Sequence, residues 1–325
     1  MKRTRSARIK EVVLDYVIVI ALVVMSIYYA IDARGFATLA NFTNILNQNS
    51  VYIILAVGMT LVILTGGIDL SVGSILALSA VVCADVAKRM EVVVGSGPAA
   101  WGIIPIAWLV ALAIGSALGA FNGVMIITFR IPPFIATLAM MTMARGAANI
   151  YCDARPIGNL PDEFKLIGTG SLGTIPIPVF IMAILSATIF VIARYTVFGR
   201  YVYAVGGNEE AARLSGINVK EVKFWVYVVS GMFSGICGII LASRLGSGDP
   251  KLGFMYELIA IAAVVLGGTS LMGGRGSVIG TVFGALFIGV LENGLLLKGV
   301  PTFYQWVVKG LVILVAVIVD QLKKR

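Results

Sequence analysis

The sequence predicts an all-α, polytopic membrane protein with about ten transmembrane helices. Of its 325 residues, 59% are hydrophobic and only 13% are charged, whereas soluble domains carry about 25% charged residues. The apolar runs approach the length of about 20 residues that a helix needs to cross a bilayer. They are also too long and too continuous for the strands of a membrane β-barrel.

The first predicted span follows a basic segment. Residues 1–10 carry five Lys or Arg side chains, and an apolar run follows at about 12–30. A signal peptide begins in the same way, but this apolar run is too long for one and no small-residue cleavage site follows it. We therefore expect a retained transmembrane helix.

The other nine spans are separated by polar, glycine-rich or proline-rich segments. The amide-rich segment 41–49 precedes the second span, and Pro132 and Pro133 block a continuous helix between the fourth and fifth. Residues 152–175 are expected to form a polar loop. The nine spans are predicted at about 50–64, 75–87, 101–129, 134–151, 177–193, 224–242, 256–266, 278–297 and 303–319.

The basic residues predict the orientation of these spans. If the N-terminus lies in the cytoplasm, most Lys and Arg residues outside the spans also fall on the cytoplasmic side, as the positive-inside rule requires. Both termini and the polar segment 194–223 are then cytoplasmic, and residues 1–325 form a single transmembrane domain. Because the net charge of +9 gathers at span ends, nucleic-acid binding is not expected.

Several chemical functions lack the residues that they need. The chain has no His, and its three Cys residues have unrelated spacings, so neither a metal site nor a disulfide framework is predicted. No phosphate-binding loop or hydrolase motif is present. We therefore expect no bond chemistry, no cofactor and no metal. The spans also carry few ionisable groups, so the energy for any uphill transport should come from another polypeptide.

The polar segment 194–223 contains a short predicted helix. Asn208 suits its N-cap, and Glu209 and Glu210 fall in its first turn, where carboxylates favour the positive end of the helix dipole. Gly216 is a suitable C-terminal stop. The helix formers between these ends are Ala211, Ala212, Arg213 and Leu214. From these residues alone, the helix is either a connector between spans or a docking element.

A glycine break at 65–74 places an acid, Asp69, between two apolar spans. A carboxylate in mid-bilayer is costly, so Asp69 either caps the third span or lies in a broken helix along a transport path. A similar Gly-Gly break occurs at 265–271 and hints at an internal repeat. Small residues spaced four apart favour close helix packing within the chain, or at a subunit interface. These rows are Gly115, Gly119 and Gly123; Gly231 and Gly235; and Gly276, Gly280 and Gly284.

Five sequence blocks resemble one family, the membrane permeases of ribose-type sugar importers of the ATP-binding-cassette (ABC) class. The blocks are AVGMTLVILTGGIDLSVGS (56–74), PFIATLAMMTMARG (133–146), GRYVYAVGGNEEAARLSGINV (199–219), YELIAIAAVVLGGTSLMGGRGSVIGT (256–281) and QWVVKGLVILVAVIVD (305–320). They occur in order over nearly the whole chain. The resemblance implies a complete permease in the inner membrane of a bacterial cell.

The resemblance also implies partners and a role for the short helix. Such permeases work as two copies, or with a sister permease, on two cytoplasmic ABC ATPase subunits, and an extracytoplasmic sugar-binding protein delivers the substrate. Glu210-Ala211-Ala212 followed by Gly216 resembles the family's coupling motif. Residues 208–216 are thus expected to dock on the ATPase, with Leu214 as the apolar anchor and Glu210 and Arg213 at the polar rim.

For a sugar, the path should offer hydroxyl and amide side chains. The candidates are Asn44, Asn47, Gln48, Asn49, Thr65, Asp69, Ser71 and Asn122. The segment 44–49 can equally be a polar cap before the second span. Two other functions stay open. The chain could be a permease for nucleosides or branched-chain amino acids, or a secondary carrier that works without an ATPase.

Overall fold

The computed structural model describes residues 5–94 and 104–322, and most of this chain is helical. The helices that correspond to the predicted spans are α1 (Arg5–Asp32), α2 (Leu39–Leu64), α3 (Val72–Val94), α4 (Ile104–Thr128), α5 (Pro133–Tyr151), α7 (Ile177–Tyr195), α10 (Val219–Leu245), α11 (Tyr256–Leu266), α12 (Val278–Leu297) and α13 (Thr302–Leu322). The shorter helices are α6 (Asp162–Thr169), α8 (Val197–Gly207) and α9 (Glu209–Leu214). The predicted start of the fourth span, 101–103, lies outside the described residues, as do the basic ends 1–4 and 323–325.

The second helix begins at Leu39, so the predicted start at residue 50 is wrong. The side chain of Thr38 caps this helix by accepting a hydrogen bond from the backbone N–H of Asn41. The amide-rich segment 41–49 is therefore the first part of α2. A local cap, together with helical hydrogen bonding, is compatible with polar side chains on the exposed face of a helix.

The segment 152–175, predicted as a polar loop, is only partly a loop, so that prediction is wrong in part. It contains α6 and the two-residue strands β1 (Ile157–Gly158), β2 (Ser171–Leu172) and part of β3 (Ile175–Pro176). β1 pairs antiparallel with β4 (Ser247–Gly248), and β2 pairs antiparallel with β3. Phe164 of α6 is fully buried, and its carbonyl accepts a hydrogen bond from Ser243 of α10. These contacts fold the segment back onto the helices.

Five helices in the described part of the chain are long and apolar enough to cross a membrane: α2, α4, α7, α10 and α12. The apolar part of α1, Val17–Asp32, and α11 are shorter. Several membrane-crossing helices in one chain support the predicted all-α, polytopic class.

The core is built around α2 and the pair α4 and α10. The second half of α2, from Ile53 to Leu64, is completely enclosed by other helices. Helices α4 and α10 meet backbone to backbone, because a Cβ atom on Gly115 would lie 2.3 Å from the carbonyl oxygen of Gly231. Likewise, a Cβ atom on Gly284 of α12 would lie 2.1 Å from the carbonyl oxygen of Ala263 in α11. The predicted close packing of these glycine rows within the chain is confirmed.

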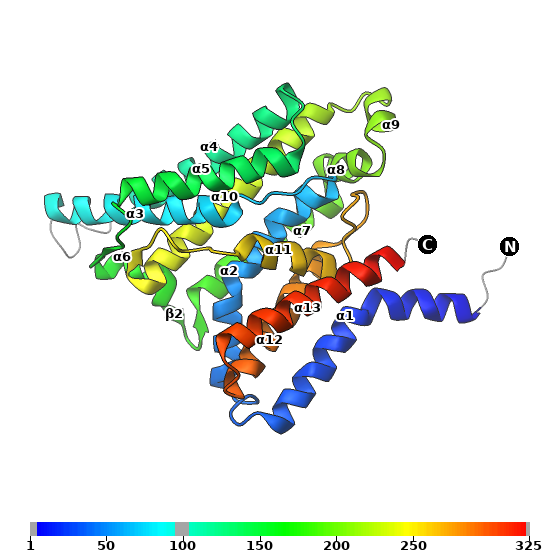
Figure 1. The fold of residues 1–325 in the computed structure, drawn as a ribbon, viewed down its shortest axis with the longest axis horizontal. Helices are drawn as coiled ribbons and strands as arrows, with labels where there is room; N and C mark the ends of the chain where they lie inside the picture. The colour runs from blue at the N-terminus through cyan, green and yellow to red at the C-terminus, as the bar shows by residue number, and fades with distance from the viewer. Residues whose placement is uncertain (1–4, 95–103, 323–325) are drawn as a thin grey trace.

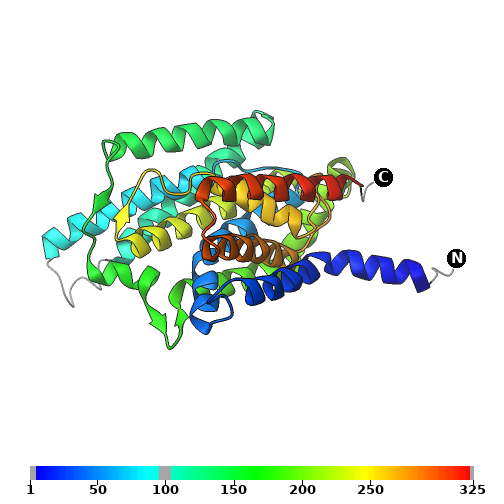
Figure 2. The ribbon, with the colours of Figure 1, turned by 60° about the horizontal axis from the view of Figure 1, so that its bottom comes forward.

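The molecule has two distinct ends (Figure 1). The start of α1 and the end of α13 lie at the same end as α8 and α9. The end of α3, together with α6 and β2, lies at the opposite end, and the turned view in Figure 2 shows the same separation. The break between α2 and α3 and the break between α11 and α12 both lie near α8 (Figure 1).

Candidate functional site

The short helix α9 has the caps that its sequence predicts. The side chain of Asn208 accepts a hydrogen bond from the N–H of Ala211 at 2.9 Å, and Gly216 follows the helix with φ +83°. Glu210 forms an ion pair with Arg213 at 2.6 Å, and the hydrogen bond from Arg213 lowers the pKa of Glu210. Glu210 therefore stays ionised near neutral pH.

One face of α9 is attached to the helical body and the other is free. Ala212 is buried, and Glu209 forms an ion pair with Lys223 of α10 at 2.6 Å. Leu214, by contrast, is 74% exposed at the end of the helix. A large apolar side chain on a small, otherwise polar helix is available for contact with another surface.

The two glycine breaks that resemble each other in sequence share one backbone geometry. After α2, the N–H groups of Gly66 and Gly67 bond to the carbonyls of Ile63 and Val62. After α11, the N–H groups of Gly268 and Thr269 bond in the same way to the carbonyls of Val265 and Val264. Both patterns are Schellman motifs with glycine in the left-handed position, at φ +77° and +85°. The similarity is therefore a shared helix-ending motif.

These two breaks meet at the end of α8. The carbonyl oxygen of Leu64, the last residue of α2, accepts a hydrogen bond from Gly274 N–H at 2.9 Å. Gly206 of α8 lies directly against both groups, because a Cβ atom there would be 1.7 Å from the Leu64 oxygen and 2.6 Å from the Gly274 nitrogen. We call Leu64, Gly206 and Gly274 the glycine junction. It connects the segment that carries α9 to both helix breaks.

Asp69 lies in the protein interior and is 0% exposed. Its Oδ1 accepts hydrogen bonds from the N–H and the hydroxyl of Ser71 at 3.0 and 2.5 Å, and its Oδ2 accepts one from Ser230 of α10 at 2.8 Å. The amide of Asn122 in α4 donates to the Ser71 hydroxyl at 2.9 Å. Asp69 thus does more than cap α3. It ties the non-helical segment between α2 and α3 to two other helices.

The remaining candidates for the path lie at the two ends of α2. Asn44 and Gln48 are exposed and joined by a hydrogen bond of 3.0 Å. Asn47 is half-buried and accepts hydrogen bonds from Arg244, whereas Asn49 is buried against Gly289 of α12. Thr65 is buried at the opposite end of the helix. The structure brings Asp69, Ser71 and Asn122 together, separately from the group at the start of α2.

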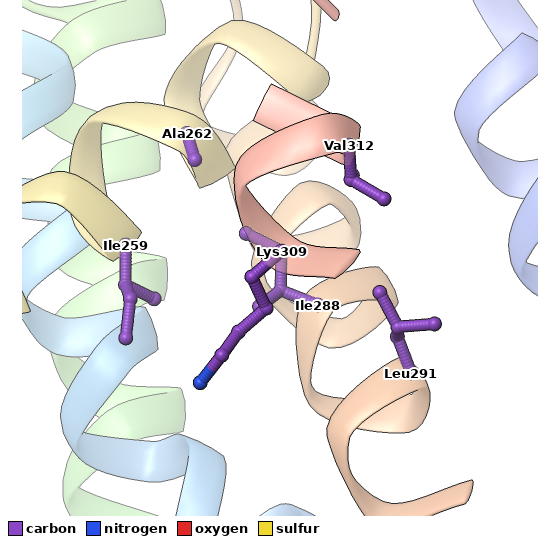
Figure 3. Close-up of a pocket in the computed structure, with 6 residues that line it drawn as sticks. All are labelled: Ile259, Ala262, Ile288, Leu291, Lys309 and Val312. Carbon is purple, nitrogen blue, oxygen red and sulfur yellow. The ribbon is translucent and has the colours of Figure 1, made fainter. Parts of the chain in front are cut away.

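Sequence reasoning missed several polar residues that lie near the first part of α2. Tyr52 of α2 meets Tyr256 of α11 edge to face, with ring centroids 4.6 Å apart. Glu292 of α12 forms an ion pair with Lys309 of α13 at 3.2 Å. Lys309 also enters a small pocket between α11, α12 and α13 (Figure 3). That pocket is lined by Ile259, Ala262, Ile288, Leu291, Lys309 and Val312.

Comparison with known proteins identifies the family. Residues 41–317 match the family described as branched-chain amino acid transport system / permease component. The chain belongs to this permease family. It is 47% identical to the ribose import permease protein RbsC of Haemophilus influenzae, over 93% of this chain and 91% of the relative. It is 46% identical to RbsC of Bacillus subtilis, over 94% and 92% of the two chains. No solved structure matches the chain.

A galactose/methyl galactoside import permease protein, MglC of Escherichia coli, is a more distant relative, at 39% identity over 95% of this chain and 93% of its own. Family membership and the apolar helices make the chain a multi-pass permease of the bacterial inner membrane, which is a transport component. Within the described residues, no group of three or more His, Cys, Asp or Glu side chains could hold a metal ion.

The buried contacts of Asp69 lead to a first prediction for this permease. Replacing Asp69 with alanine would leave the Ser71 and Ser230 donors without their acceptor, at a cost of about 1–3 kcal/mol for each orphaned group. Asp69→Asn keeps one acceptor oxygen, so it should lose much less stability. In mild detergent, the midpoint temperature of thermal unfolding should decrease clearly for Asp69→Ala and slightly for Asp69→Asn. It should not decrease for the exposed control Asp162→Ala. Native stability of Asp69→Ala combined with lost import would instead favour a direct role in the path.

Proposed function

We propose that this permease is the membrane-spanning subunit of an ATP-driven importer of ribose or a similar monosaccharide. The observation that carries the proposal is α9, a capped helix with an exposed Leu214, at the same end of the molecule as the start of α1 and the end of α13. The names of the relatives, ribose and galactose import permeases, support a sugar as substrate.

In this proposal the chain is one transmembrane domain of ten spans with both termini in the cytoplasm. An even number of spans agrees with the position of the first and last helices at one end of the molecule. The segment 194–223 then faces a cytoplasmic ABC ATPase. The opposite end, with α6 and β2, faces an extracytoplasmic sugar-binding protein. A second copy or a sister permease completes the membrane part.

Coupling would run through α9 and the glycine junction. Residues 208–214 and Gly216 dock on the ATPase, with Leu214 in an apolar groove and the Glu210–Arg213 pair at its rim. A displacement of α8 and α9 would also displace the backbones of Leu64 and Gly274, because Gly206 is in direct contact with both. The end of α2 and the segment after α11 therefore move together when ATP closes the ATPase pair.

The proposed path begins at Asn44, Asn47 and Gln48. Amide groups bind sugar hydroxyls without a fixed charge, and weak contacts allow a transported solute to leave again. Thr65, Asp69, Ser71, Asn122 and Asn49 are enclosed in this structure. In the proposal they line the path only after the helix breaks have moved, and until then they hold the helices in place.

The test is purification of the chain from native membranes in mild detergent, with mass spectrometry of the bound proteins. We expect an ABC ATPase at equal or double amount. The complex is then placed in proteoliposomes with ATP inside and the binding protein outside, and import of radiolabelled D-ribose is measured. Import should require ATP, and D-ribose should be preferred to L-leucine. Import by the chain without an ATPase, driven by an ion gradient, would identify a secondary carrier.

A permease for branched-chain amino acids is the second candidate. Only the description of the family favours it, and the import assay with L-leucine distinguishes it from a sugar permease.

A further inference from the structure

A polar stripe runs along the first part of α2. Asn44, Gln48 and Tyr52 are four residues apart, so they lie on one face of the helix. Asn44 and Gln48 are exposed, whereas Tyr52 is half-buried. One turn further along, Ala56 is completely enclosed. The stripe therefore starts at the end of α2 that lies away from α9, and it stops at Tyr52.

Tyr256 lies at the inner end of this stripe. It is the first residue of α11, which follows a non-helical segment after β4 and is too short to span a membrane fully. Its ring meets that of Tyr52 at an angle of 61°. Both residues are half-buried. Two tyrosines from different helices thus form the inner end of the polar stripe.

Arg244, in the last turn of α10, lies within electrostatic range of both tyrosines. One of its terminal nitrogens donates to the Asn47 carbonyl at 2.7 Å, to the Asn47 side chain at 3.1 Å and to Ser50 at 3.2 Å. Its Nε is buried and has no hydrogen-bond partner in the part of the chain that the structure describes. Within the described residues, no carboxylate lies close enough to form an ion pair with it.

An arginine at the end of a spanning helix, with a spare donor and no counter-ion among the described residues, indicates a site for a ligand with acceptor atoms. Glu292 interacts electrostatically with both tyrosines, but it already forms an ion pair with Lys309. The local surface offers guanidinium and amide donors, the edges of two rings and two phenol hydroxyls that interact with each other. This set of groups suits a small neutral molecule that is rich in hydroxyls.

We propose that Tyr52, Tyr256 and Arg244 form a transient contact site for the monosaccharide, reached along the stripe of Asn44 and Gln48. The proposal rests on the proposed function and adds residues that select the substrate within the path. Arg244 donates to a sugar hydroxyl, and the two phenols hold the sugar between α2 and α11. Because α2 ends at the glycine junction and the segment after α11 passes through it, the contact is broken when the junction moves.

The first test removes only the hydroxyl groups. Tyr52→Phe and Tyr256→Phe are measured in the reconstituted complex with ATPase and binding protein. The number of D-ribose molecules imported per ATP hydrolysed should decrease about three- to tenfold, the loss expected for one hydrogen bond. The concentration of loaded binding protein that half-saturates the ATPase rate should not change. Tyr304→Phe, the same change on an exposed tyrosine of α13, should leave import unchanged.

The second test measures access to the stripe. The native Cys83, Cys152 and Cys237 are buried, so the background of labelling by a membrane-impermeant thiol reagent is low. Gln48→Cys should react from the extracytoplasmic side, and millimolar D-ribose should slow that reaction. L-Leucine should not. The control is Phe42→Cys, at an exposed residue on another face of α2. It should react at the same rate with and without D-ribose.

The two tests separate this inference from the proposed function. One outcome is that the native complex imports D-ribose and both tyrosine variants import the same number of D-ribose molecules per ATP hydrolysed as the native complex does. In that case the contact site is wrong, but the proposed function as a sugar importer is retained. Equal labelling of Gln48→Cys with and without D-ribose would overturn the site as well. If the native complex imports no sugar at all, the proposed function fails, and the contact site fails with it.

Discussion

Replacing Leu214 with aspartate is expected to reduce sugar import to background without affecting the fold. Leu214 is 74% exposed, so it contributes little to the stability of the isolated chain. Buried in a groove of the ATPase, however, a leucine side chain would contribute about 1.5–3 kcal/mol to the association. An aspartate at this position loses that contribution and also places an unpaired carboxylate in the apolar groove, which is a further cost.

The measurement is co-purification of the ATPase with the Leu214→Asp variant, together with ATP-dependent import in proteoliposomes. The matched control is Leu172→Asp, the same change at an exposed leucine of β2, at the opposite end of the molecule. Both variants should reach the membrane in native amounts. Only Leu214→Asp should lose the ATPase. Full binding and full import by Leu214→Asp would show that α9 is only a connector between α8 and α10.

Local sequence signals predicted the helices well because each depends on neighbouring residues. Apolar runs located a helix for every predicted span, and the observed bounds of α11 and α12 match the predicted 256–266 and 278–297. The caps of α9 were also predictable, since Asn208 and Gly216 act on groups within three or four residues. The start of α2 was missed because its amides were interpreted as a cap, while the actual cap is Thr38.

Contacts between distant segments could not be predicted in this way. The sequence left Asp69 as either a cap or a lining residue, because nothing near it indicates Ser230, its partner in α10. Tyr52 and Tyr256 occur within apolar runs, where tyrosine is common. The four-residue spacing of Asn44, Gln48 and Tyr52 was the one signal that could have revealed the polar stripe before the structure did.

The glycine junction could not be predicted from the sequence either. Substitution at this junction is the second change for which we expect a large effect. Gly206 and Gly207 are adjacent in the sequence, and both end α8. A Cβ atom on Gly206 would lie 1.7 Å from the carbonyl oxygen of Leu64, which is far inside van der Waals contact. A Cβ atom on Gly207 would have no neighbour within 4 Å among the described residues. The structure therefore predicts opposite results for the same substitution at two neighbouring positions.

Gly206→Ala is expected to abolish import, and Gly207→Ala to retain it. The added methyl group forces Leu64 and Gly274 apart and breaks the hydrogen bond between them, so α8 no longer holds the end of α2 against the segment after α11. Import in proteoliposomes and thermal unfolding in mild detergent are measured for both variants. If Gly206→Ala still folds and binds the ATPase, ATP hydrolysis should continue without sugar movement, because the junction joins the coupling helix to the breaks. Native import by Gly206→Ala would mean that the three backbones separate easily, and the movement of α9 would then have to reach the path by another route.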